Sequence, residues 1–369
     1  MNFLLLGNGF DLHHGLPTGY IDMMLIFRHL TENSDVSYKN VGEILASYKS
    51  STSDDNNNRL LDYYQTYDEA LKNINWTSDF SWAKLAQNRW YQYFCHTKNE
   101  DLTWIDFELE IKNALEGIEQ EYSCEKHKDN NDGNNAVVEF LIPAEKLSKE
   151  KLVLLLYEEL CVFKQAMCEY LHYFVDEMLP NLNPSSAVDF VKDVDMVISM
   201  NYTSTFEKLY LSGSRCNSQE IVHYHGQVAD REGIVVGINS DEADEYCNGK
   251  KPNTTYISFK KYCQRILRDF DKQYLKSLQL QNYWNSYHSK NSNFFETNKL
   301  CVMGHSLNES DADLIKELFS TSCRCTVYYH NLQALGGYIC NLTRIFGRCE
   351  FENMRQEGKL IFTPLETKS

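Results

Sequence analysis

Long apolar runs are missing from this sequence. No uninterrupted apolar span is long enough to cross a bilayer, and the residues before Gly7 form neither a basic n-region nor an apolar stretch of signal-peptide length. Membrane-spanning and secreted proteins are therefore disfavoured, and we expect a cytoplasmic protein with no membrane partner.

Positive charge is also scarce. Lys and Arg total 36 against 52 Asp and Glu, so the formal net charge is −16. A surface that binds polyanions needs clustered Lys and Arg to contact phosphates, which disfavours nucleic acid as a partner. At 369 residues and 43% hydrophobic content, the chain can still bury a large core, as one elaborated domain or two.

The cysteines lack the spacing of a metal site. Twelve are scattered along the chain, and the tight pair Cys323-Arg-Cys325 has no matching second pair. Reduced, mostly buried thiols are the interpretation that fits a cytoplasmic protein. Adjacent His13 and His14 would point in different directions on a helix, and a His223-x-His225 pair has no third ligand in view, so no metal site is predicted.

The chain begins with a strand, a glycine turn and a helix. The apolar run before Gly7 breaks at Gly7-Asn8-Gly9, and an amphipathic segment follows from Ile21 to Leu30. Glycines at such a turn let backbone N–H groups approach a phosphate at a helix start. The turn lacks the third glycine of the dinucleotide fingerprint and a P-loop lysine, so an ordinary strand-to-helix turn remains the alternative.

Apolar strands and helical patterns alternate along the rest of the chain. Short buried strands are predicted at 3–6, 194–200, 220–226, 233–238, 299–304 and 325–330. Helical patterns cover 20–30, 60–74, 82–94, 104–118, 151–179, 258–287 and 332–346. This alternation predicts an α/β fold, a Rossmann-like, mostly parallel sheet with two helical insertions. The core would comprise 1–30 and 190–369, with one insertion at about 241–297 and a mostly helical insertion at 31–189.

Polar residues follow the last apolar residue of several predicted strands. They are Asn8 with Asp11, Asn201, His225, and His305 with Ser306. Parallel sheets bind ligands beyond the carboxyl ends of their strands, so these side chains are expected to converge on one crevice. Ser204-x-x-Glu207 also has the spacing of a capping box for the next helix.

These motifs, in this order, resemble the bacteriophage abortive-infection AbiH family. The resemblance rests on Gly7-Asn-Gly-Phe-Asp11 with Gly15-Leu-Pro-Thr18-x-Tyr20, on Asn201-Tyr-Thr203 and His225-Gly226, and on Gly304-His-Ser-Leu307 with Asp311. Trp104-x-Asp106-x-Glu108 and Phe259-Lys-Lys-x-x-Gln264-Arg265 also look like that family. The segments 31–90 and 120–191 carry no matching motif. The resemblance implies an anti-phage defence protein.

The same motif order is similar, more remotely, to sirtuin-like NAD-consuming enzymes. That similarity implies that Gly7 and Gly9 face the pyrophosphate, that Gly304 and Ser306 lie near the adenine-side ribose, and that Asn201 holds the nicotinamide ribose or its attacking water. His225 would be the base that activates a ribose hydroxyl or water. The nucleotide-binding segment implied by the similarity also takes in Asn8, Asp11, Pro17 and Thr18.

The sequence departs from the sirtuin-like pattern at two points, and these departures limit the activities that the similarity implies. Asp11 replaces the usual serine, and no paired Cys-x-x-Cys zinc module is present, which disfavours protein deacetylation. NAD would then be a substrate rather than a bound cofactor, hydrolysed to nicotinamide and ADP-ribose. The alternatives are a non-catalytic nucleotide or ADP-ribose sensor, and a nuclease or phosphoesterase effector. A defence enzyme of this kind implies an inhibited or homo-oligomer-gated state and a phage trigger, neither of which the sequence identifies.

Overall fold

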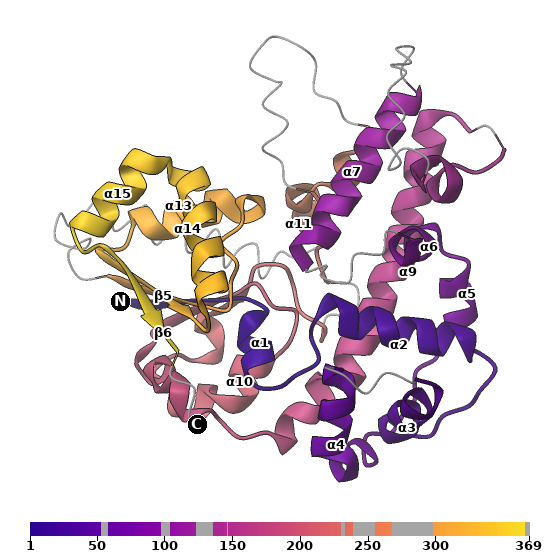
Figure 1. Ribbon diagram of the computed structural model, residues 1–369, viewed down its shortest axis with the longest axis horizontal. Helices are drawn as coiled ribbons and strands as arrows, with labels where there is room; N and C mark the ends of the chain where they lie inside the picture. Colours follow the sequence, from indigo (N-terminus) through magenta and orange to yellow (C-terminus); the bar gives the residue numbers. More distant parts are fainter. Residues whose placement is uncertain are drawn as a thin grey trace. The chain divides into compact units, whose positions relative to one another are not determined.

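The chain forms two compact units in a computed structural model (Figure 1). The structure describes residues 1–52, 58–96, 104–122, 136–145, 147–229, 233–238, 255–267 and 298–365. The sheet unit comprises Met1–Leu16, Met178–Gly233 and Arg268–Ser369, and the helical unit comprises Pro17–Glu177 and Ile234–Leu267. Across these described ranges, none of the helices combines the length and the apolar character needed to cross a membrane.

The sheet unit is built on six parallel strands in the order β3-β2-β1-β4-β5-β6. Their bounds are β1 Asn2–Leu6, β2 Met196–Ser199, β3 Ile221–His223, β4 Lys299–Met303, β5 Arg324–Tyr329 and β6 Leu360–Pro364. Leu4 of β1 pairs with Val197 on one side and Cys301 on the other. This order is that of dinucleotide-binding doubly wound sheets, in which the direction of winding reverses between β1 and β4.

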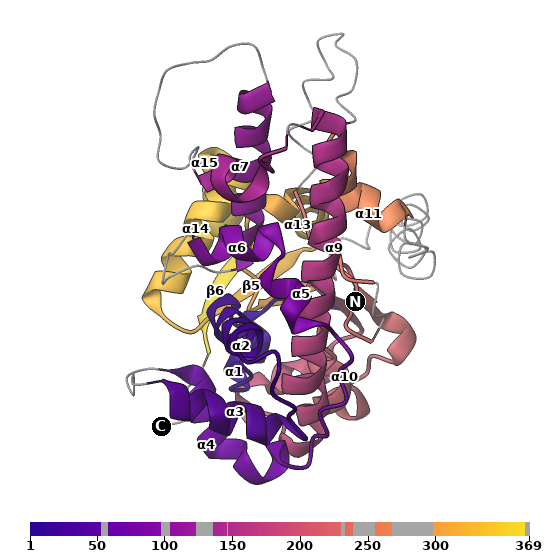
Figure 2. The ribbon, with the colours of Figure 1, turned by 90° about the vertical axis from the view of Figure 1, so that its right-hand side faces the viewer.

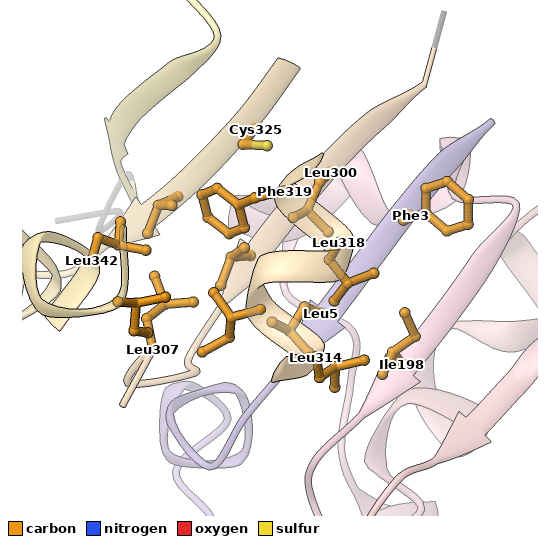
Figure 3. Close-up of a cluster of buried hydrophobic side chains, with 14 of the residues drawn as sticks. Phe3, Leu5, Ile198, Leu300, Leu307, Leu314, Leu318, Phe319, Cys325 and Leu342 are labelled. Atoms are coloured by element: carbon orange, nitrogen blue, oxygen red, sulfur yellow. The ribbon is translucent and has the colours of Figure 1, made fainter. Parts of the chain in front are cut away.

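Both faces of the sheet are covered, because successive residues of each strand point to opposite sides. Phe3 and Leu5 belong to a cluster with Leu314 and Phe319, shown in Figure 3. Leu4 and Leu6 belong to the cluster on the other face, with Phe206 among its members. The central strands are therefore buried on both faces, which is why they appear in the sequence as continuous apolar runs.

Short helices connect the strands of the sheet unit. They are α1 Gly9–His13, α10 Thr205–Leu209, α13 Ala312–Ser320, α14 Leu332–Phe346 and α15 Arg348–Gln356, with 3-10 turns at Asp176–Asn181, Ser186–Asp193, Leu211–Gly213, Ser218–Glu220 and Glu309–Asp311. Helices α13 and α14 contribute to the cluster that contains Phe3, whereas α1 and α10 contribute to the cluster that contains Leu4.

The helical unit is organised around its longest described helix, α9 Lys149–Phe174, which stands lengthwise in Figure 2. Helices α2, α5 and α6 pack against it. The other elements are α2 Tyr20–Glu32, α3 Val41–Ser51, α4 Arg59–Leu71, α5 Trp82–Ala86, α6 Arg89–His96, α7 Trp104–Tyr122, a π-helical turn Val137–Leu141, a 3-10 turn Ile257–Phe259 and α11 Lys261–Leu267. Aromatic side chains fill this core, with Phe163 of α9 in ring contact with Phe27, Phe94 and Phe107.

The Rossmann-like α/β fold predicted from the sequence is confirmed, with one sheet holding the strands near Leu4 and Val302. The predicted strand at 233–238 is wrong: Ile238 makes only an isolated bridge with Lys260, and the segment lies in the helical unit. A side chain pairs with the backbone of Val236 in place of a neighbouring strand: the Gln264 amide accepts from Val236 N–H at 3.3 Å and donates to Val236 O at 2.7 Å. Strand β6 was not predicted.

Several helix bounds differ from the sequence patterns. The pattern at 82–94 is two helices, α5 and α6, and the pattern at 151–179 is α9 followed by a 3-10 turn that contains Pro180. The expected domain boundaries, 1–30 with 190–369 and 31–189, differ from the observed units at residues 17–30, 178–189 and 234–240. The predicted helix at 258–287 is a 3-10 turn followed by α11, and its part beyond residue 267 lies outside the described residues.

Candidate active site at the carboxyl edge of the sheet

Polar side chains of the sheet unit gather where β1, β2, β3 and β4 end. Gly7 follows β1, Asn201 follows β2, His225 follows β3, and Gly304 with His305 follows β4. The adjacent strands β1 and β4 flank the point at which the winding of the sheet reverses. Open α/β sheets bind their ligands outside the carboxyl ends of the strands at this point.

Three glycines hold the turn after β1 against the turn after β4. A Cβ built on Gly9 would lie 2.7 Å from Gly304 Cα, and one built on Gly7 would lie 2.5 Å from His305 Cα. Gly304 has φ of 71°, and a Cβ there would lie 2.1 Å from Phe10 N. A side chain at any of the three would collide with backbone, so glycine is required for the two turns to approach each other.

The predicted phosphate-binding role of the first turn is therefore revised. Gly7 N–H donates to Met303 O at 3.1 Å, and Gly9 N–H donates to Gly304 O at 2.9 Å. Both donors are used within the protein, whereas a phosphate cradle needs them directed at the ligand. These glycines let the turn after β4 approach the turn after β1 closely. Packing between the two turns therefore explains the spacing of Gly7 and Gly9 without a ligand.

Asp11 of α1 is a buried carboxyl group beside this turn, with 1% of its surface exposed. Thr203 Oγ1 donates to Asp11 Oδ2 at 2.6 Å, and Thr205 Oγ1 in turn donates to Thr203 Oγ1 at 3.2 Å. Burial raises the pKa of Asp11 to about 6, against the opposing effect of Thr203, Thr205 and Asn201. Among the described residues no group makes a well-formed hydrogen bond to Oδ1. The carboxyl group is thus about half protonated near pH 6, where an ordinary aspartate is ionised.

Both the side chain and the backbone of Asn201 make hydrogen bonds. Its side-chain Nδ2 donates to Gly7 O at 3.1 Å, which joins the turn after β2 to the turn after β1. Its backbone O lies 3.3 Å from Nδ1 of His223, and its backbone N–H donates to Ser199 Oγ at 3.2 Å. The hydrogen bond to Gly7 O therefore places the candidate catalytic residue Asn201 against the turn after β1.

His223 lies between Asn201 and Glu207. Its Nε2 forms a short contact with Glu207 Oε1, while Nδ1 faces Asn201 O. The predicted capping box at Ser204 is wrong, because α10 has no side-chain cap and Glu207 is paired with His223 instead. A joint metal site of His223 and His225 is not formed either, since each ring nitrogen Nε2 faces a different carboxylate.

His225 and His305 lie on opposite oxygens of one carboxylate, Asp311. His225 Nε2 is 3.3 Å from Asp311 Oδ1, and His305 Nε2 is 3.4 Å from Oδ2. Leu307 N–H donates to His305 Nδ1 at 3.0 Å, so the proton of the neutral His305 ring is on Nε2 and faces Asp311. All three side chains are at least nine-tenths buried, which strengthens the electrostatic contact between them.

The other predicted site residues are distributed over both units. Asn8 is the residue before α1, and Ser306 follows His305 and accepts through its backbone O from Asn341 Nδ2 at 2.9 Å. Pro17 and Thr18 belong to the helical unit, where Tyr170 Oη donates to Pro17 O at 2.6 Å. The structure thus gathers the glycines, Asn201, His225 and Asp11 in one unit, and it does not bring Pro17 and Thr18 into that unit.

The sequence did not predict two pairings at the site, that of His223 with Glu207 and that of Asp311 with both His225 and His305. His305 carried a usable signal, because it follows a predicted strand. Glu207 carried none, since its spacing indicated a helix cap. In the described part of the chain, no cluster of three or more His, Cys, Asp and Glu side chains is arranged to bind a metal ion.

The two remaining family-like motifs meet inside the helical unit. Lys261 Nζ donates to Glu108 Oε2 at 2.7 Å, and the Lys261 side chain is 2% exposed. Lys164 Nζ donates to Gln264 Oε1 at 2.9 Å, which fixes the amide that satisfies Val236. These contacts join α7, α9 and α11, so the motifs have a structural use within that unit.

The fold and the site define an α/β protein with a doubly wound, dinucleotide-binding type of sheet and a histidine-, carboxylate- and amide-lined carboxyl edge. The family model described as bacteriophage abortive infection AbiH matches residues 3–329, and the chain belongs to that family. No curated protein and no solved structure matches the chain. The similarity to sirtuin-like enzymes rests on motif order alone.

Proposed function

We propose that this AbiH-family protein acts in anti-phage defence by hydrolysing NAD to nicotinamide and ADP-ribose at the carboxyl edge of its sheet. The observation that carries the proposal is the ion pair of His225 with Asp311 at the same edge of the sheet as Asn201 and the β1 turn. A histidine oriented by a carboxylate is a common arrangement for a general base, because the carboxylate fixes the tautomer and stabilises the imidazolium.

The proposed reaction is an attack of water on the anomeric carbon of the nicotinamide ribose. The bond from that carbon to the nicotinamide nitrogen breaks, its electron pair neutralises the cationic leaving group, and no strong acid is needed. The His225 ring, whose Nε2 lies 3.3 Å from Asp311 Oδ1, would accept the proton of the attacking water, and the nearby carboxylate would stabilise the imidazolium that forms.

Asn201 suits the positioning of ribose hydroxyls in this reaction. An amide has two N–H donors and one acceptor oxygen, and the hydrogen bond to Gly7 O uses one donor. Asn201 is also a hydrogen-bond partner of the Asp11 carboxyl group, so the amide oxygen is the atom that would accept from a ribose hydroxyl, without adding a charge near the oxocarbenium-like transition state. The pyrophosphate would be bound by groups other than the N–H groups of Gly7 and Gly9, which are already used.

The test is nicotinamide release from NAD by the purified protein. His225→Ala removes the base and is expected to lower turnover per folded molecule about a hundredfold to ten-thousandfold. Asn201→Ala removes positioning and is expected to cost on the order of a hundredfold. His330→Ala, at the end of β5 and outside the Asp311 contact, is the matched histidine control.

Two outcomes would replace the proposal. NAD binding measured by calorimetry, without nicotinamide release, would identify a nucleotide sensor that uses the same edge of the sheet. Equal nicotinamide release by wild type and by both alanine variants would assign the activity to another site. In a bacterial host, loss of phage protection by His225→Ala at unchanged protein level would connect the chemistry to defence.

A further inference from the structure

We propose that His223 and Glu207 are positioning residues that hold Asn201 for catalysis. The inference rests on the proposed function, because it assigns to Asn201 the orientation of the substrate ribose or water. It gives a catalytic context to two residues for which the sequence predicted none, and it assigns a role to the second histidine–carboxylate pair, His223 with Glu207.

The turn that carries Asn201 depends on side chains for its shape. Strand β2 ends at Ser199, which pairs in register with His223, and the turn after it runs past the end of β1. The backbone N–H of Asn201 donates to Ser199 Oγ at 3.2 Å, and its backbone O lies 3.4 Å from Ser199 Oγ and 3.3 Å from the ring of His223, so side chains rather than strand backbone pair with it. The His223 ring therefore contributes, together with Ser199, to the orientation of Asn201.

The hydrogen bonds of His223 determine where its protons are. A carbonyl oxygen only accepts, so the contact with Asn201 O places a proton on Nδ1. The contact between Nε2 and Glu207 Oε1 then needs one further proton, located on the ring or on the carboxyl group. In either arrangement Nδ1 remains a donor to Asn201, and Glu207 fixes the plane of the ring.

The contacts continue from Asn201 to the turn after β1. Asn201 Nδ2 donates to Gly7 O, and Gly7 packs against His305, whose ring faces Asp311. Glu207, His223 and Asn201 thus form one connected series that ends at the backbone of Gly7, beside His305. The His223 side chain is 4% exposed and Glu207 is 22% exposed, so Glu207 lies toward the surface end of this series.

Two amide substitutions separate the roles of the two ring nitrogens. His223→Asn keeps an N–H donor near the position of Nδ1 and loses the contact with Glu207. His223→Gln keeps a polar group near the position of Nε2 and loses the donor to Asn201. A positioning role predicts that His223→Gln lowers kcat on the order of a hundredfold with KM little changed, and that His223→Asn retains most of kcat.

Stability is expected to follow the opposite order. His223→Asn leaves Glu207 without its partner and should unfold at a lower temperature than His223→Gln. A purely structural pair predicts that activity per folded molecule does not distinguish the variants, or that it follows their thermal stability. That result would overturn the proposal.

A second measurement does not depend on turnover. In protein labelled with ¹⁵N at asparagine, the side-chain signal of Asn201, assigned with Asn201→Ala, reports its hydrogen bond to Gly7 O. We expect His223→Gln to shift this signal and speed its hydrogen exchange, while His223→Asn leaves both close to wild type. A wild-type protein that releases no nicotinamide but shows this pattern would refute the proposed function and retain the positioning role; an Asn201 signal unchanged in both variants would refute the positioning role.

Discussion

Asp11 shows how a single buried carboxyl group couples the site to pH. Its Oδ2 accepts from Thr203, which follows Asn201 in the turn after β2, so the carboxyl group joins α1 to that turn. Burial raises its pKa from 3.8 to about 6 because the charged form loses its hydration. The native protein therefore binds this proton more tightly than the unfolded chain does.

We expect Asp11→Asn to remove part of the pH dependence of stability. With the native pKa raised, the contribution of Asp11 is fully favourable below pH 4 and is lost as pH rises toward about 6. The loss is about 1.4 kcal/mol for each unit of pKa difference, or about 3 kcal/mol in all. Denaturant unfolding at pH 4.5 and pH 7 measures the slope.

Asparagine keeps an oxygen that accepts from Thr203 and has no ionisable group, so Asp11→Asn removes the titration while replacing the second carboxyl oxygen by an NH₂ group. Asp313→Asn, at an exposed position of α13, controls for the removal of one carboxylate. An unchanged slope in Asp11→Asn would show that this carboxyl group does not carry the pH dependence.

At the scale of elements, the contact between the turns after β1 and β4 determines the shape of the carboxyl edge. Gly9 N–H donates to Gly304 O, and an added Cβ on either residue would meet the backbone of the other turn. If Gly9 faced an open ligand site, as the sirtuin-like similarity implies, Gly9→Val would leave stability nearly unchanged. The structure contradicts that expectation, because backbone cannot move aside as a flexible side chain does.

We expect Gly9→Ala to destabilise the sheet unit by about 1–3 kcal/mol through overpacking against Gly304 Cα. Gly336→Ala in α14 is the matched control, because an added Cβ there meets no atom within 4 Å. It should stabilise the protein by about 0.5–1 kcal/mol, since alanine loses less backbone entropy in a helix. Denaturant midpoints measured on both variants test the difference, and equal effects would contradict the packing role of Gly9.

At the scale of the whole molecule, charge sets which partners are excluded. The net charge of −16 is spread over a chain in which ion pairs such as Arg59 with Asp22 and Arg89 with Glu159 use part of the positive charge.

The family match at residues 3–329 includes segments of both units, and α14, α15 and β6 lie beyond it.

We expect the whole protein to bind duplex DNA only weakly, with Kd above about 10⁻⁴ M at physiological salt, because phosphate contacts need clustered cations. Fluorescence anisotropy with a labelled 30-base-pair duplex, on the order of three helical turns, measures this binding. Saturable binding that weakens as salt rises would contradict the expectation and would favour the nuclease alternative.

Much of the fold was predictable from local pattern. The apolar runs around Leu4, Val197 and Val302 predicted buried parallel strands, because a strand with apolar residues on both faces is stable only when both faces of its sheet are covered. Helix α14 matches its predicted bounds. Strand β6 escaped prediction because it lies at the sheet edge and is only partly buried, and the segment at 233–238 misled because the Gln264 side chain replaces a neighbouring strand.

The sequence alone determined β1 to β5 and the placement of Asn201, His225 and His305 just past strand ends, because periodicity and strand termini are local properties. Only the tertiary structure decided the partners of these side chains. Glu207 pairs with His223 rather than capping α10, Asp311 lies between two histidines, and Gly9 packs against Gly304. Each contact joins residues from separate segments of the chain. Folding of the sheet brings them together, so spacing along the chain does not predict them.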